Sequence, residues 1–138
     1  CPYGRDELAA KLVEKGFEAP EAAAAADRCV ALGFVNDENY AAMVARHYTA
    51  RGFGERRVLE ELRRRRVPRE YWDAALEAVP DDEDGAYRCL CAKMRGRAPE
   101  PEELRRALAA VQRRGFGYQE VREAAERYRR EYLSQEEA

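Results

Sequence analysis

Three stretches of the chain share one pattern of apolar and charged positions. They read ELAAKLVEKGF at 7–17, RVLEELRRRRV at 57–67 and ELRRALAAVQRRGF at 103–116. Apolar residues recur at intervals of three and four, the period of an α-helix, and a basic residue, then glycine or its substitute, then a large apolar residue closes each stretch. The copies lie about fifty residues apart, which predicts a repeated supersecondary unit of that length.

Each stretch predicts a helix that stops where the glycine or its substitute adopts a left-handed backbone conformation. Gly16 and Gly115 fill that position in the outer copies, whereas Arg66 fills it in the middle copy. A side chain in the left-handed region costs about 1 kcal/mol, so the middle helix is expected to end differently or less sharply. The apolar residue that follows is expected to fold back onto the last turn.

A second helix is predicted after each stop, and a third helix before the second and third copies. Proline in the first turn and Asn or Asp at the N-cap mark helix starts, and Pro20, Pro68, Asn36 or Asp37, and Asp81 to Asp84 suit these roles. No apolar alternation is long enough to predict a β-strand. The expected helices are 7–17, 21–34, 37–52, 57–67, 69–79, 84–96, 103–116 and 118–133.

The pattern therefore predicts an all-α protein made of tandem repeats of three-helix modules, elongated and modular. The first module, 1–35, shows two helices, and its leading helix is missing. Because the chain opens at Cys1 without a methionine, we expect the natural N-terminus to be missing too. The second module spans 36–79 and the third 80–133, and an acidic tail, 134–138, is expected to fray.

Charge is distributed unevenly along the 138 residues, whose formal net charge is −2. Residues 46–69 carry 9 basic side chains against 3 acidic ones, whereas residues 1–45 and 70–93 are both acidic. A near-neutral chain with one basic segment predicts a local contact surface and argues against a protein that coats DNA along its whole length.

On a helical projection of residues 55–66, Val58, Leu59 and Leu62 point inward, and Arg57 and Arg64 point nearly straight out. The basic group could complement the helix C-terminus and stay solvated, or it could bind a partner. We favour a partner, because arginine's planar fork suits both carboxylates and phosphates, and we expect charge reversal at Arg57 and Arg64 to weaken binding. The candidate binding residues are Arg46, Arg51, Arg56, Arg57, Arg63, Arg64, Arg65 and Arg69.

The sequence shows no motif for catalysis, metal binding or membrane insertion. Cys1, Cys29, Cys89 and Cys91 form no Cys-x-x-Cys pair, and His47 has no ligand at metal-binding spacing. No phosphate loop, nucleophile motif or apolar run long enough to span a membrane is present. We therefore predict a cytoplasmic, monomeric protein that is not an enzyme and uses no cofactor or metal. The aromatic residues Tyr40, Tyr71, Trp72 and Tyr87 fall on helical stripes and are expected in the core.

Residues 32–67, LGFVNDENYAAMVARHYTARGFGERRVLEELRRRRV, and residues 112–124, QRRGFGYQEVREA, carry a resemblance to a known family. The sequence resembles the RecX family, regulators of the RecA recombinase in bacterial recombination and DNA repair. The absent leading helix and Arg66 depart from the family pattern. The matching positions are Gly33, Phe34, Asn36, Asp37, Tyr40, Ala41, Arg46, Gly52, Gly54, Arg56 and Leu62.

The resemblance implies a regulator that lodges in the helical groove of the RecA–DNA filament and curbs its ATPase and strand exchange, with weak direct DNA contact. Two alternatives stay open on the residues alone. One is a stand-alone DNA-binding protein that uses helix 55–66 for recognition, although the acidic balance elsewhere would repel a duplex. The other is a helical-repeat scaffold for an unrelated partner.

Overall fold

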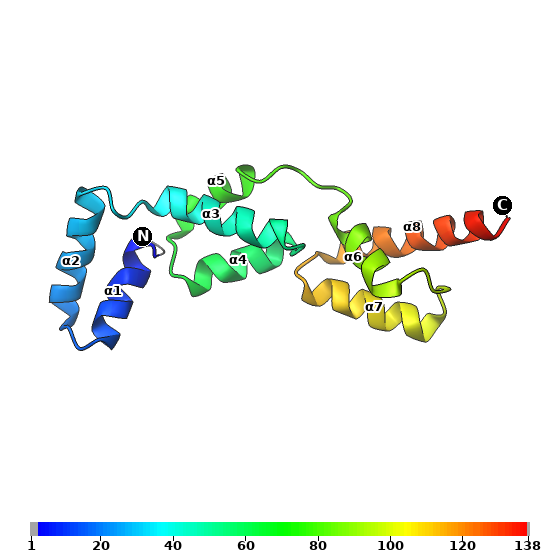
Figure 1. The fold of residues 1–138 in the computed structure, drawn as a ribbon, viewed down its shortest axis with the longest axis horizontal. Coiled ribbons are helices and arrows are strands. Elements are labelled where there is room, and N and C mark those ends of the chain that lie inside the picture. The colour runs from blue at the N-terminus through cyan, green and yellow to red at the C-terminus, as the bar shows by residue number, and fades with distance from the viewer. Residues whose placement is uncertain (1–2, 138) are drawn as a thin grey trace. The chain divides into compact units, whose positions relative to one another are not determined.

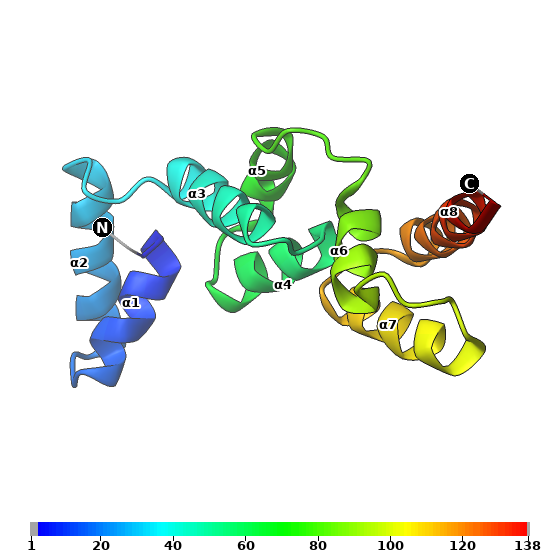
Figure 2. The same ribbon diagram turned by 45° about the vertical axis from the view of Figure 1, so that its right-hand side comes forward.

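The computed structural model describes residues 3–137, and every regular element in that range is helical (Figures 1 and 2). The predicted all-α class is confirmed. Cys1, Pro2 and Ala138 lie outside the described residues. The elements are α1 (Arg5–Glu14), α2 (Ala19–Ala31), α3 (Asp37–Ala50), α4 (Glu55–Arg64), the 3-10 helix η1 (Arg69–Tyr71), α5 (Trp72–Glu77), α6 (Gly85–Met94), α7 (Pro101–Arg113) and α8 (Tyr118–Glu137).

Two predicted elements differ from the structure. The helix expected over 69–79 begins as a 3-10 turn, and its α-helical part, α5, has only 6 residues. The expectation that the acidic tail frays is wrong as far as Glu137, because α8 continues through it for 20 residues. Residues Ser134 to Glu137 contain no glycine or proline to stop the helix, and Gln and Glu are good helix formers.

The helix stops of the three copies are alike. Gly16 and Gly115 have φ values of 105° and 102°, and Arg66 has a φ of 57°, so all three are left-handed. The amide of Phe17 donates to the Leu12 carbonyl at 3.1 Å, and the amide of Val67 donates to the Leu62 carbonyl at 3.0 Å. The expectation that the middle helix ends differently because of Arg66 is therefore wrong.

The apolar residue after each stop behaves less uniformly. Val67 and Phe116 are 4% and 6% exposed, as expected of residues that fold back onto a helix, whereas Phe17 is 50% exposed. In the first copy, α1 buries none of its residues, so no core is present there to receive the phenyl ring.

The chain divides into two compact units, which we describe separately. The first contains the described residues up to His47 together with Val58–Pro80, and the second contains Tyr48–Arg57 together with the chain from Asp81 onward. Their boundaries run through α3 and α4, so the turn that joins these helices belongs to the second unit.

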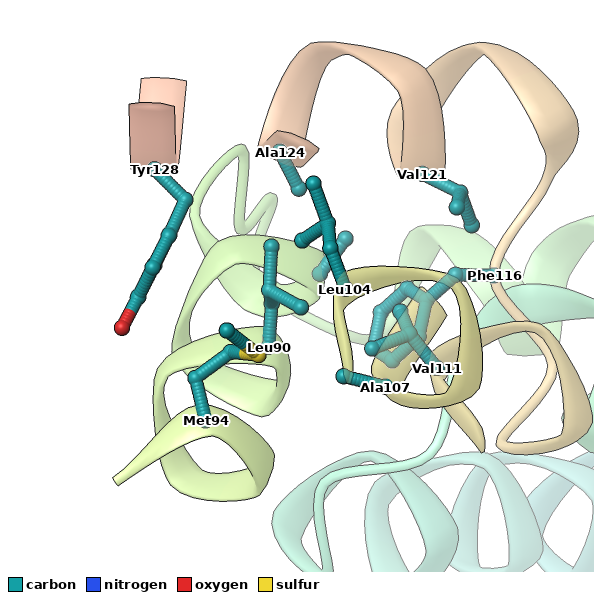
Figure 3. Packing of buried hydrophobic residues seen from close by; sticks show 10 residues of the cluster. Leu90, Met94, Leu104, Ala107, Val111, Phe116, Val121, Ala124 and Tyr128 are labelled. Atoms are coloured by element: carbon teal, nitrogen blue, oxygen red, sulfur yellow. The ribbon is translucent and has the colours of Figure 1, made fainter. Parts of the chain in front are cut away.

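The second unit has a core at the meeting of α6, α7 and α8 (Figure 3). Leu90, Met94 and Val111 have no exposed surface, and Leu104 is 2% exposed. The hydroxyl of Tyr128, at the edge of this core, donates to the Arg97 carbonyl at 2.6 Å. Apolar residues at helical spacing thus form a three-helix packing of the predicted kind.

In the first unit, α1 and α2 lie side by side (Figures 1 and 2), and polar contacts join α1 to α3. The Arg5 amide, at the start of α1, donates to Asp37 Oδ1 at 2.9 Å. The side chain of Asn36 caps α3, because its Oδ1 accepts from the Asn39 amide at 3.0 Å. Of the two predicted caps, Asn36 therefore performs the role, and Asp37 serves α1 instead.

The predicted core aromatics are only partly buried. Tyr40 is 5% exposed and lies in the core as expected. Tyr71, Trp72 and Tyr87 are half-buried, and of these Tyr87 packs against the core of α6, α7 and α8. Arg69 lies over the ring of Trp72 and Arg127 over the ring of Tyr87, so a charged side chain covers a face of each ring.

Candidate partner-binding surface

Helix α4 presents two chemically different faces. Val58 and Leu62, at 1% and 0% exposure, anchor the inner face, which agrees with the predicted inward direction. On the other side, Arg56, Arg63 and Arg64 are exposed. These arginines lie on a helix of only 10 residues, and the burial of Val58 and Leu62 determines which way that helix faces.

A buried carboxylate lies beneath this arginine face. Glu61 is 3% exposed. Its Oε1 accepts from Arg64 Nη1 and its Oε2 from Arg65 Nε, both at 3.4 Å. Both ion pairs join neighbours on one helical face, since Arg64 lies three residues and Arg65 four residues after Glu61. The Arg64 side chain stays 77% exposed although its guanidinium pairs with the buried Glu61 carboxylate.

Arg65 points into the first unit. Its Nη1 donates to the Tyr40 hydroxyl at 2.9 Å, and that hydroxyl donates to Glu7 Oε1 at 2.8 Å. Burial raises the pKa of the Tyr40 hydroxyl, and the charge of Arg65 opposes the rise. The chain of contacts from Glu7 through Tyr40 and Arg65 to Glu61 joins α1, α3 and α4. Arg65 therefore serves the fold of this unit.

Two further candidate arginines flank Trp72. The indole nitrogen donates to the Val67 carbonyl at 3.0 Å, which holds the ring in place. The guanidinium carbons of Arg63 and Arg69 lie 6.0 Å and 5.2 Å from the ring centre. The Trp72 ring therefore contacts two arginines, Arg63 and Arg69, whose shared contact the sequence pattern did not predict. The available signal was the placement of Trp72 three residues after Arg69.

Arg57, expected to point straight out, is half-buried. Its guanidinium carbon lies 4.9 Å from the ring centre of Phe53 and 5.8 Å from that of Tyr48. A third arginine, Arg114, lies over the same Phe53 ring at 4.0 Å, and its Nη2 donates to the Arg51 carbonyl at 2.8 Å. Sequence reasoning missed Arg114 because it is 61 positions beyond Phe53.

The remaining candidates, Arg46 and Arg51, are exposed on α3 and directly after it. Among residues 3–137, no group of three or more His, Cys, Asp and Glu side chains is arranged to hold a metal ion. Within the same range, the helices are too short or too polar to cross a lipid bilayer.

The fold and this surface define a helical protein of three-helix domains, one of whose helices, α4, is rich in arginine. Residues 36–76 match the family model described as RecX, second three-helix domain. Proteins named Regulatory protein RecX are similar to most of the chain. One from Trichlorobacter lovleyi is 33% identical over 90% of this chain and 88% of its own length, and one from Vibrio campbellii is 30% identical over 86% and 78%. The chain belongs to the RecX family of regulatory proteins.

Proposed function

We propose that this protein regulates the RecA recombinase by binding the RecA–DNA filament and lowering its ATPase and strand-exchange activity. Membership of a family whose members are named regulatory proteins supports the regulatory role. The observation that carries the proposal is the set of exposed arginines on α4, with Arg46, Arg51 and Arg69 close to it in sequence.

Within that set, the residues have separate tasks. Arg63 and Arg64 are exposed at the end of α4 and are available to a partner, as is Arg56 at its start. Arg65 and Glu61 support them from inside the unit. Cations near a helix C-terminus are stabilising, so Arg63 and Arg64 stabilise α4 even when no acidic partner is bound.

A filament offers both of the anions that guanidinium recognises. Recombinase carboxylates and DNA phosphates each accept two parallel hydrogen bonds from an arginine fork. A regulator seated across neighbouring subunits would hinder the subunit movements that ATP hydrolysis and strand exchange require. One bound regulator would then affect several subunits.

The test is the ATPase of the cognate RecA on single-stranded DNA, titrated with this protein. We expect inhibition well below one regulator per RecA subunit. The double substitution Arg63→Glu with Arg64→Glu should shift the titration to at least tenfold higher concentration, or about 1.4 kcal/mol. Arg129→Glu with Arg130→Glu changes net charge equally on exposed positions of α8 and should leave inhibition intact.

Two other results would redirect the assignment. If the Arg63 and Arg64 variant folds and inhibits like the native chain, these arginines do not face the filament. An unaffected ATPase combined with tight, salt-sensitive binding to naked duplex DNA would favour the stand-alone DNA-binding protein instead.

A further inference from the structure

The same four residues, Arg-Gly-Phe-Gly, form two turns of the chain, at 51–54 between α3 and α4 and at 114–117 between α7 and α8. In the second unit these turns pack against each other. The Gly54 amide donates to the Arg114 carbonyl at 2.9 Å, and the Arg56 amide donates to the Gly115 carbonyl at 3.0 Å. The second turn therefore accepts hydrogen bonds from Gly54, just before α4, and from Arg56 in the first turn of α4.

Two glycines allow this approach. A Cβ atom on Gly54 would lie 2.6 Å from the carbonyl carbon and oxygen of Gly115, and one on Gly115 would lie 2.6 Å from the Arg57 amide nitrogen. Real Cβ atoms do not approach backbone so closely, so only glycine fits at either place. The contact between the turns is thus specified by the sequence motif itself.

The contact gathers positive charge from distant parts of the chain. Arg51, Arg56 and Arg113 are exposed around it, and none of them has an ion pair with a carboxylate in the range 3–137. Arg57 and Arg114 share the Phe53 ring, at 4.9 Å and 4.0 Å.

An exposed aromatic residue stands beside this charge. Tyr118 begins α8 directly after the second turn, and 67% of its surface is exposed. We name Arg51, Arg56, Arg57, Arg113, Arg114 and Tyr118 the paired-turn surface.

We infer that the paired-turn surface binds a single nucleic-acid strand, with the arginines on its phosphates and Tyr118 stacked on a base. Basic grooves combined with exposed aromatic rings are how proteins hold single strands without sequence preference. An acidic protein fits less well, because protein interfaces have an apolar centre and Tyr118 is the single large apolar side chain exposed here among residues 3–137. A duplex would leave Tyr118 without an open base face.

This inference goes beyond the proposed function, and its test needs no recombinase. The full chain is titrated onto a fluorescent oligothymidine, followed by anisotropy, from about 50 to 200 mM salt, where nonspecific affinities are micromolar or weaker. Arg56→Ala with Arg113→Ala should reduce the slope of log affinity against log salt by about 1.4, since each phosphate contact to a single strand contributes about 0.7. Arg129→Ala with Arg130→Ala is the control and should not change the slope.

Tyr118→Ala should weaken binding roughly fivefold or more with an unchanged salt slope, and Tyr118→Phe should bind like the native chain. The inference is overturned if the Arg56 and Arg113 variant binds the oligonucleotide as tightly as its control. Circular dichroism of each variant verifies that it folds.

Discussion

Arg66 occupies a left-handed backbone conformation that the other two copies give to glycine. Its φ of 57° is enforced by the hydrogen bond from the Val67 amide to the Leu62 carbonyl and by the burial of Val67. The repeat therefore imposes its geometry on a residue with a side chain, and the strain is stored at the end of α4.

Arg66→Gly should raise the free energy of unfolding by about 1 kcal/mol, because glycine adopts this conformation without a Cβ clash. Urea denaturation followed by circular dichroism measures the change. Glu60→Gly, on the exposed middle of the same helix, is the control and should lower the free energy by about 1 kcal/mol. A destabilised Arg66 variant would mean that the arginine side chain contributes more than its backbone strain costs.

The fourth residues of the two Arg-Gly-Phe-Gly turns have opposite surroundings. Gly54→Ala should destabilise by about 1–3 kcal/mol more than Gly117→Ala, because the new methyl group would press on Gly115 backbone. At Gly117 the nearest atom is Glu120 Oε1 at 3.4 Å, which can move. Both positions precede a helix, so the loss of a favoured N-cap glycine cancels in the comparison of melting curves. Equal losses would show that the two turns do not hold each other closely.

At the scale of the element, α4 is amphipathic in charge as well as in polarity. Its inner face adds a buried carboxylate, Glu61, to the apolar pair Val58 and Leu62. Burial of a charge is costly unless it is paired, and here Arg64 and Arg65 pair with it. Both arginines pair with Glu61, but the Arg64 side chain is 77% exposed and the Arg65 side chain only 32% exposed.

Tyr40→Phe removes the hydroxyl that joins α1 to α4, so we expect a loss of about 1–2 kcal/mol. Tyr118→Phe, at an exposed position, should cost almost nothing. Because burial raises the pKa of the Tyr40 hydroxyl above its ordinary 10.0, the folded state keeps this proton longer than the unfolded state. Native stability should therefore fall as pH rises above about 10, and the phenylalanine variant should lose less over that range in urea titrations.

At the scale of the whole molecule, the two N-terminal helices, α1 and α2, bury much less apolar surface than the C-terminal helices α6, α7 and α8. α1 buries no residue and α2 buries only Ala22 and Ala26. The core of α6, α7 and α8 buries leucine, methionine and tyrosine side chains. Since apolar burial is the main stabilising term, resistance to local opening should differ along the chain.

Amide hydrogen exchange, followed by mass spectrometry of peptides, should therefore show α1 and α2 exchanging at least tenfold faster than α7. Peptides from α4 serve as an internal reference, because Val58 and Leu62 are buried. Equal protection of α1 and α7 would mean that the hydrogen bonds of Arg5 and Tyr40 stabilise the first helices as strongly as a core does.

Sequence periodicity predicted the α-helical class, the approximate positions of most helices and the left-handed stops at Gly16 and Gly115, because these depend on residues three or four apart. The inward direction of α4 followed from Val58 and Leu62 in the same way. The contacts of Arg57 and Arg65 did not follow from this pattern. Their partners, Phe53, Tyr48 and Tyr40, lie on other turns or helices, and the spacing of residues within one helix does not predict such contacts. The binding role of the arginine group stays a prediction.

The sequence by itself determined which segments are helical and the approximate limits of most of them, since a helix is stabilised by contacts within one or two of its own turns. The tertiary structure decided which arginines meet. Only the packing of two glycine-containing turns brought Arg114 over Phe53 and beside Arg51, because that contact joins segments about sixty residues apart and depends on the close approach of Gly54 and Gly115.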